Sequence, residues 1–173
     1  MNTIRKTVIT GVAAGLFASW IKSVAEPPLQ KIGEEKFPPT DEELNLKGAD
    51  VTNQPENMPP AVLANRVSEK ISGHPLSHDE TLASMKAIHY GLGTALGIGY
   101  VMLQEKYPKI SGGEGLIAGG IIWALTHGSA VPALGLQGKV REMPKSWWVW
   151  EYGSHLIFGI ALEQSRKAVH RIL

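Results

Sequence analysis

The chain contains no cysteine among its 173 residues, so disulfide bonds and thiolate chemistry are excluded. It also has no basic tract and a formal net charge of only +1, so nucleic acid is not an expected partner. No Ser-His-Asp or Cys-His arrangement is apparent, and the sequence Gly91-Leu92-Gly93 lacks the Lys-Ser/Thr ending of a phosphate loop. We therefore expect a protein that is not an enzyme. A membrane-embedded hydrolase or transferase that uses Glu and His is the remaining enzymatic alternative.

Charge and glycine are distributed unevenly along the chain. The mean hydropathy of −0.05 and the charged fraction of 19% are both compatible with a soluble protein. However, ten of the sixteen acidic residues lie between Pro27 and Glu80, and long stretches elsewhere carry almost no charge. Most of the nineteen glycines lie in those apolar stretches, which is more common in membrane helices than in soluble ones. The distribution, rather than the average, indicates a membrane protein.

Four apolar segments could cross a bilayer as helices, because about twenty apolar residues span a hydrocarbon core of roughly 30 Å. A soluble bundle is the alternative. Segments so rich in glycine make poor soluble helices, since each glycine costs roughly 1 kcal/mol against alanine. We therefore predict an all-α fold, a four-helix polytopic membrane bundle. The expected spans are 7–25, 81–103, 115–138 and 146–162.

Lysine and arginine in the short flanks predict the orientation in a plasma membrane. One side has seven of them, whereas the short loop on the other side has Lys139, Arg141 and Lys145. This excess favours both termini in the cytoplasm. The first segment also resembles a signal peptide, but Lys22 lies where such a peptide has neutral residues, so we expect a retained helix. The seven basic residues on the side of the termini are Arg5, Lys6, Lys106, Lys109, Arg166, Lys167 and Arg171.

The predicted organisation has three parts. Residues 1–26 form the first transmembrane helix, residues 27–80 form an acidic proline-rich segment outside the membrane, and residues 81–173 form three further transmembrane helices with a basic C-terminus. Three Pro-Pro pairs predict a mostly extended backbone in 27–80. One short amphipathic helix is expected from Pro60 to a stop at Gly73, with an apolar stripe of Leu63, Val67 and Ile71. A loosely ordered tether is the alternative.

Small residues repeat on one face of each predicted span, at spacings of three and four. Such residues let helix backbones approach closely in lipid, so we expect these faces to be packed. Glycine-lined faces left exposed on a bundle of only four helices could also pack against a second copy, which makes a homo-oligomer or a larger membrane complex an expected assembly. The predicted packing glycines are Gly11, Gly15, Gly93, Gly97, Gly120 and Gly159.

Ionisable residues lie on the same faces and, because successive helices alternate in direction, at a similar depth. A charge in the hydrocarbon costs on the order of 3 kcal/mol, so these groups are expected to pair inside the bundle. Pro132 is expected to break the third helix just beyond His127. The cytoplasmic half is expected to hold no such set, with Glu114 alone near its edge. The predicted polar layer under the outer surface is Lys22, Glu26, Lys86, His89, His127, Glu151 and His155.

The polar layer has several interpretations. It could be purely structural, neutralising charge and fixing helix register. It could bind an ion, a proton or a partner and respond to acid, since histidine beside carboxylate titrates near physiological pH. A proton-coupled transporter or channel and a haem- or metal-binding subunit with ligands from His89, His127 and His155 are further alternatives. The sequence does not identify a cofactor. The nearby tryptophans Trp147, Trp148 and Trp150 are typical of an interfacial aromatic belt.

Several short motifs resemble the YagU-like family of bacterial inner-membrane proteins. They are Glu26-Pro27-Pro28 at the end of the first helix, the run 57–60 (Asn-Met-Pro-Pro) before the second, His127 followed by Pro132-Ala133-Leu134-Gly135, and Glu151 with His155 in the last. The resemblance covers most of the chain. It implies an inner-membrane location and a domain of unknown molecular function. It also marks Glu26, His127, Pro132, Glu151 and His155 as the positions to test first.

Overall fold

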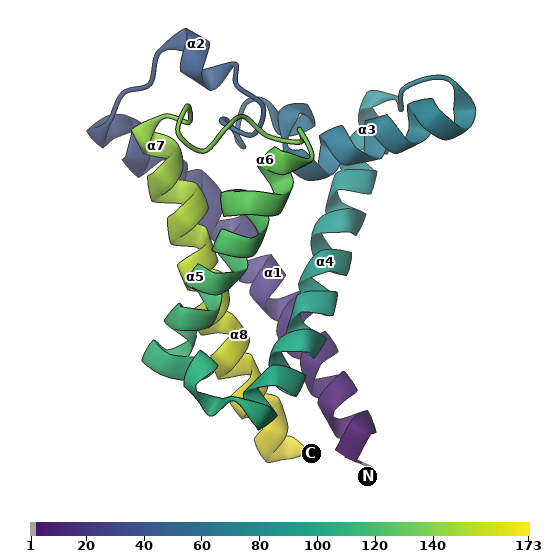
Figure 1. Cartoon of the computed structure of the whole chain (residues 1–173), viewed down its shortest axis with the longest axis vertical. Coiled ribbons are helices and arrows are strands. Elements are labelled where there is room, and N and C mark those ends of the chain that lie inside the picture. The colour runs from purple at the N-terminus through teal and green to yellow at the C-terminus, as the bar shows by residue number, and fades with distance from the viewer. Residues whose placement is uncertain (1–2) are drawn as a thin grey trace. The chain divides into compact units, whose positions relative to one another are not determined.

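The computed structural model describes residues 3–173, and every regular element within that range is helical (Figure 1). The predicted all-α class is therefore confirmed. Two helical stretches are long and apolar enough to cross a membrane, Thr3–Lys36 and Pro108–Ala133. The longer helices are α1 (Thr3–Lys36), α3 (Pro59–Ser72), α4 (His78–Lys106), α5 (Leu116–Leu125) and α8 (Gly153–Ile172). The short elements are α2 (Asp41–Leu44), η1 (Pro55–Asn57), η2 (Pro108–Gly115), η3 (Thr126–Ala130), α6 (Val131–Ala133), α7 (Lys145–Trp147) and η4 (Trp148–Tyr152).

The chain forms two compact units, each of which is described by itself. The first unit contains Met1–Ala25, Tyr90–Trp123 and Tyr152–Leu173, and the second contains Glu26–His89 and Ala124–Glu151. Helices α1 and α4 each contribute residues to both units. Within the first unit, the beginning of α1 and the end of α8 lie at the same end (Figure 1).

In the first unit, α1 packs against α4 through glycines. A Cβ added to Gly11 would overlap the backbone of Ile98, and one added to Gly15 would overlap the backbone of Gly93. A Cβ on Gly97 would overlap the carbonyl oxygen of Gly11. The sequence stripe of small residues thus corresponds to a line along which two helix backbones touch. Between these helices and their neighbours lies an apolar core of Ala14, Ala18, Tyr100, Val101, Ala118, Ile122, Phe158, Ala161 and Leu162.

A second glycine contact joins α5 to α8 in the same unit. A Cβ on Gly119 would overlap the carbonyl oxygen of His155, and a Cβ on Gly159 would overlap that of Gly115. Gly120 is the glycine predicted for this contact, but a Cβ on Gly120 would meet only the Tyr152 hydroxyl, at an ordinary contact distance of 3.6 Å. Helix α5 begins directly after a left-handed turn at residues 113–115. Its contact face lies at Gly119, one position before the glycine that the spacing predicts.

In the second unit, α1 continues to Lys36 through Pro27 and Pro28, where an extended chain was expected. Proline fixes φ at a helical value, so it costs a hydrogen bond without forbidding the helix. Long-range contacts hold the last turns. The buried Gln30 side chain donates to Asp50 Oδ1 at 2.7 Å and accepts from the Thr52 hydroxyl at 2.8 Å. Gly33 packs against the backbone of Ser146.

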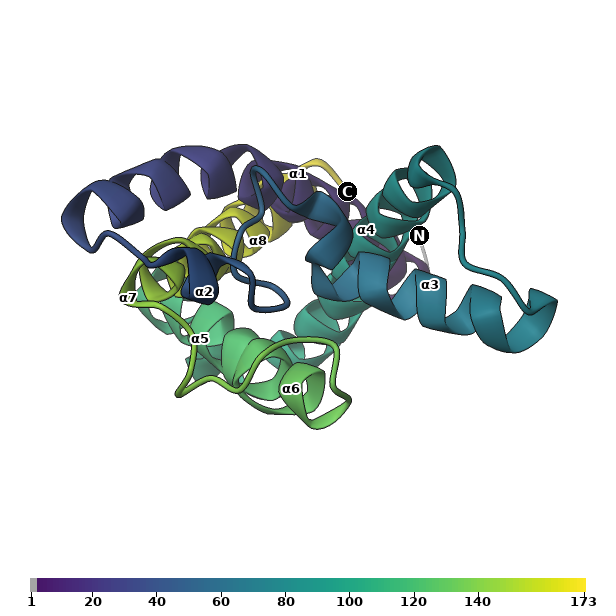
Figure 2. The same ribbon diagram turned by 90° about the horizontal axis from the view of Figure 1, so that it is seen from above.

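The acidic segment is an ordered part of the second unit. Helix α3 begins one residue earlier than expected, at Pro59, and ends at Gly73, whose φ of 81° matches the predicted stop. A short loop then leads from α3 into α4 (Figure 2). Ala61 and Ala64 form the buried side of α3. Two residues of the predicted apolar stripe are instead exposed, Val67 at 46% and Ile71 at 82%.

Tryptophans form part of the core of the second unit. Trp147 and Trp150 are fully buried, whereas Trp148 is 41% exposed. The Trp147 and Trp148 rings meet edge to face at 5.5 Å. Two of the three tryptophans are therefore core residues in the structure rather than members of an interfacial belt.

Candidate functional site

Two π-helical turns in the second unit each carry one residue of the predicted polar layer. His127 lies in η3, and Glu151 lies in η4. Beyond η3 the Val131 N–H donates to the Thr126 carbonyl, five residues back, and Pro132 has no N–H to continue an α-helical pattern. The described helix ends at Ala133, just after Pro132. Single π turns are rare and occur frequently at functional sites.

The orientation of His127 is fixed by Gln137. The His127 Nδ1 lies 2.7 Å from Gln137 Oε1, and the Gln137 side chain is buried. The amide nitrogen of Gln137 points at two carbonyl oxygens, those of His127 and Gly138, each at 3.4 Å. Its amide oxygen therefore faces the imidazole and can only accept, so Nδ1 is the ring nitrogen that donates. In the neutral imidazole this leaves the lone pair on Nε2.

The Nε2 atom faces a buried carboxylate. His127 Nε2 lies 3.6 Å from Glu151 Oε1, and the side chains are 16% and 1% exposed. Two acceptor atoms that face each other in a buried place repel unless a cation stands between them. A proton on Nε2 supplies one such cation. A metal ion is another, because ligand atoms 3.6 Å apart can both lie at roughly 2.0–2.2 Å from one ion.

The remaining residues of the predicted layer are distributed over the two units. Glu26 is buried in the second unit, where His89 is half-buried and Lys86 is exposed. The glycine contacts of α4 with α1 lie at Gly93 and Gly97, about two turns beyond Lys86, whose long side chain reaches the surface. The first unit contains Lys22 and His155, both buried. Of the seven residues, we therefore take His127 and Glu151 as the site.

Gln137 belongs to the site although it is not among the residues predicted from the sequence. It follows the helix break by five residues, in the loop after Pro132 and Gly135. Gly135 has a φ of 65°, and the carbonyls of Leu134 and Gly135 accept hydrogen bonds from Arg66 of α3 at 2.7 and 3.0 Å. The loop is thus held in a fixed position. A polar side chain shortly after a helix-breaking proline was the only signal available in the sequence.

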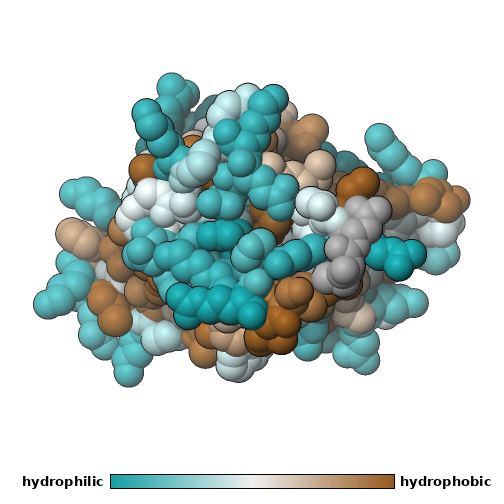
Figure 3. All heavy atoms as spheres, turned by 90° about the horizontal axis from the view of Figure 1, so that it is seen from below, coloured by the Kyte–Doolittle hydropathy of each residue, from teal (hydrophilic) through white to brown (hydrophobic). Residues whose placement is uncertain are grey.

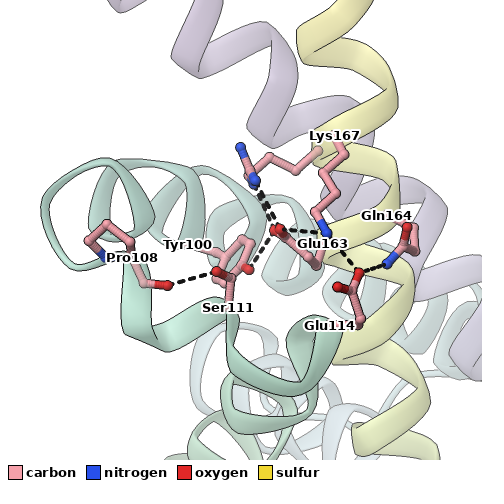
Figure 4. Close-up of polar contacts among 8 residues, drawn as sticks. Tyr100, Pro108, Ser111, Glu114, Glu163, Gln164 and Lys167 are labelled. Atoms are coloured by element: carbon pink, nitrogen blue, oxygen red, sulfur yellow. Dashed lines mark hydrogen bonds and ion pairs between the residues drawn. The ribbon is translucent and has the colours of Figure 1, made fainter.

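A second polar cluster, which the sequence does not predict, occupies the first unit (Figure 4). Glu163 is 1% exposed and accepts hydrogen bonds from the Tyr100 hydroxyl at 2.7 Å and from Arg166 at 2.7 and 2.9 Å. Nearby, the Glu114 carboxylate accepts from Lys167 and Gln164, each at 2.7 Å. Glu114 itself has a left-handed φ of 58°. These contacts join α4, η2 and α8, and every carboxylate in the cluster has a cationic partner.

A third cluster surrounds Asp50 in the second unit. Its carboxylate is buried and accepts hydrogen bonds from Gln30 and from the backbone and side chain of Asn53. Burial alone would raise the pKa of Asp50, but these hydrogen bonds together outweigh it and hold the pKa below its usual value. All partners are neutral groups that fix a loop to α1. The cluster therefore has a structural role.

The comparison with known families matches residues 28–164, which is more than half of the chain. The chain belongs to the DUF1440 family. That family is described as a protein of unknown function. The DUF1440 match includes both π turns and Gln137, and it begins inside α1. No curated protein and no solved structure matches the chain.

Proposed function

We propose that the protein is an integral membrane component of the YagU-like type that crosses a bacterial inner membrane four times. The crossings are α1, α4, the run from α5 to α6, and the run from α7 to α8. Large apolar side chains on the outer faces of α1 and α5 support this proposal, because water does not favour such exposed stripes. They include Leu16, Phe17, Trp20 and Val24 of α1 and Leu116, Ile117 and Ile121 of α5, all more than 40% exposed.

The proposed topology has both termini in the cytoplasm. An even number of crossings returns the chain to its starting side, and the beginning of α1 and the end of α8 lie at one end of the first unit (Figure 1). The excess of lysine and arginine in the flanks favours the cytoplasm for that end. Alkaline carbonate extraction tests the membrane location: the protein is expected to stay in the pellet, and release into the supernatant would refute an integral location.

Within the membrane we propose a non-enzymatic role, the binding of a cation by His127 and Glu151. The observation that supports it is the 3.6 Å approach of two acceptors, Nε2 and Oε1, in a buried place. When the cation is a proton, the pair becomes an ion pair, and uptake or loss of that proton makes the site respond to acid. The side chains of His127, Glu151 and Gln137 include no hydroxyl or thiol nucleophile, which favours binding over catalysis.

A divalent metal ion is the second candidate for the bound cation. Metal-ligating histidines usually donate their other ring N–H to a carbonyl or carboxylate, which fixes the tautomer. The contact of Nδ1 with Gln137 Oε1 at 2.7 Å has this form. Imidazole with carboxylate is a ligand set that suits zinc.

The chain offers a matched control for testing the site. His78 and Glu56 form an exposed His–Glu pair at 2.9 Å. Purified protein is equilibrated with Zn²⁺, the bound metal is measured by mass spectrometry, and tryptophan fluorescence is followed from pH 5 to 8. Glu151→Gln is expected to abolish zinc binding or the pH response of the fluorescence, and Glu56→Gln to leave both unchanged. A wild-type protein that binds no zinc and shows a flat pH profile would refute the proposed cation site.

A further inference from the structure

Three helix ends meet in the first unit and form one surface. The Thr7 hydroxyl at the beginning of α1 donates to Glu105 near the end of α4 at 2.9 Å. Lys167 near the end of α8 donates to Glu114 of η2 at 2.7 Å. The beginning of α1 and the end of α8 both lie on this side of the unit (Figure 1). The side chains of these helix ends therefore share one surface, which we call the basic end.

The basic end carries an excess of positive charge that the protein does not neutralise. Its three acidic residues all have partners within the unit. Glu105 accepts a hydrogen bond from the Thr7 hydroxyl, and Glu114 and Glu163 form ion pairs. Arg166 and Lys167 are used in those ion pairs. Five basic side chains remain that have no acidic partner among residues 3–173. They are Arg5, Lys6, Lys106, Lys109 and Arg171.

Exposed apolar side chains lie on the same helix ends. Ile4 is 71% exposed at the start of α1, Met102 and Tyr107 are 59% and 52% exposed near the end of α4, and Ile172 is 84% exposed at the end of α8. Seen from this end, hydrophilic side chains gather in the middle of the face, and hydrophobic ones lie just below them (Figure 3). The Lys106 ammonium lies 5.3 Å from the centre of the Tyr107 ring. Cations beside apolar and aromatic groups are typical of a protein surface at the boundary between lipid headgroups and acyl chains.

We propose that the basic end binds the phosphate headgroups of anionic phospholipids. This inference rests on the proposed membrane location. The excess of seven basic over three acidic side chains complements a negatively charged leaflet, and each lysine or arginine near such a surface strengthens binding about fivefold. The exposed apolar side chains favour a lipid over free phosphate, because acyl chains cover them and a small anion does not.

The test uses the full-length protein in a nonionic detergent. Phosphatidylglycerol, or phosphatidylcholine with the same acyl chains, is added, and the bound lipid is counted by native mass spectrometry. The wild-type protein is expected to retain phosphatidylglycerol in preference to phosphatidylcholine. Lys106→Gln with Lys109→Gln should weaken phosphatidylglycerol binding by roughly thirtyfold, the product of two such factors. Lys139→Gln with Arg141→Gln, the same charge change in exposed residues of the other unit, should leave it unchanged.

Three results would overturn the inference. Equal retention of the two lipids would mean that the cations make no contribution. Displacement of the lipid by an equal concentration of inorganic phosphate would identify a simple anion site. An equal loss in the Lys139/Arg141 control would show a non-specific effect of net charge. Carbonate extraction separates this inference from the proposed function. If the protein stays in the pellet but does not prefer phosphatidylglycerol, the lipid site alone is refuted. If the protein is released but still binds phosphatidylglycerol, only the integral location is refuted.

Discussion

Gly97 of α4 lies directly against the backbone of Gly15 in α1. A Cβ built on Gly97 would come within 2.7 Å of the Gly15 Cα and 2.8 Å of its nitrogen. Both neighbouring atoms belong to the backbone of a helix, so neither can move aside as a flexible side chain would. The α1–α4 contact therefore requires glycine at position 97.

Gly97→Ala should destabilise the protein by about 1–3 kcal/mol, the usual cost of overpacking a tight contact. Gly99→Ala on the same helix is the matched control, because nothing lies within 4 Å of a Cβ at that position. There the better helix propensity of alanine should stabilise the protein by up to about 1 kcal/mol. Thermal or denaturant unfolding in detergent measures both. Equal effects of the two substitutions would mean that α1 and α4 do not pack through this face.

Glu163 is the acceptor on which Arg166 and Tyr100 converge, so its charge should be important for stability. Glu163→Gln leaves Arg166 without its anionic partner and should cost about 3 kcal/mol, the low end for a broken buried pair, because Arg166 keeps 14% of its side chain exposed. The surface carboxylate Glu142, which pairs with Lys139 at 3.2 Å, is the control. Glu142→Gln should cost no more than about 1 kcal/mol. Unfolding free energies that agree within error for the two variants would contradict this assignment.

Much of the helical framework follows from the sequence, because apolar length and helix-stop residues act locally. The extent of α3 follows from prolines at its start and from Gly73, which takes the left-handed conformation that ends a helix. The close contacts of Gly11, Gly15, Gly93 and Gly97 agree with their spacing for the same reason.

The features that the sequence did not predict depend on contacts between distant residues or on irregular turns. Helix α1 passes through Pro27 and Pro28 because Gln30 is held by Asp50, twenty residues away. The Glu163–Arg166 pair is visible as an i, i+3 spacing, but its Tyr100 partner lies 63 residues earlier. Trp150 lies inside the irregular π turn η4 and Trp147 directly precedes it, and both are buried in the core. Gln137 joins the site only because the loop after Pro132 folds back toward His127.

Asp50 should make the stability of the protein depend on acid. Hydrogen bonds hold its pKa below the usual value in the folded state, although burial acts in the opposite direction. A carboxyl group of this kind stabilises the fold fully above its unfolded pKa, near 3.9, and the stabilisation is lost as the pH falls through the folded pKa. Wild-type protein should therefore lose stability below about pH 4. Asp50→Asn should be less stable by about 2 kcal/mol at neutral pH, because its amide cannot replace the charged acceptor, and its profile should be flatter in acid.

The measurement for Asp50 is the free energy of unfolding between pH 2.5 and 7. Glu42→Gln controls for the loss of one negative charge, since Glu42 is an exposed residue of α2. A wild-type profile parallel to that of Asp50→Asn throughout the acid range would show that the carboxylate is not stabilised by its hydrogen bonds.

Gln137 should determine the cation affinity of His127 without touching the cation. Its Oε1 accepts from Nδ1 and so keeps the Nε2 lone pair directed at Glu151. Gln137→Leu removes that acceptor, and zinc affinity should fall by about 10- to 100-fold, as for other partners of metal-binding histidines. Gln137→Glu keeps an acceptor at the same reach and should bind zinc at least as tightly as the wild type. The surface variant Gln164→Leu should leave the affinity unchanged. Zinc titration followed by calorimetry compares the four proteins, and an equal loss in the Leu and Glu variants at position 137 would show that Gln137 only fills space.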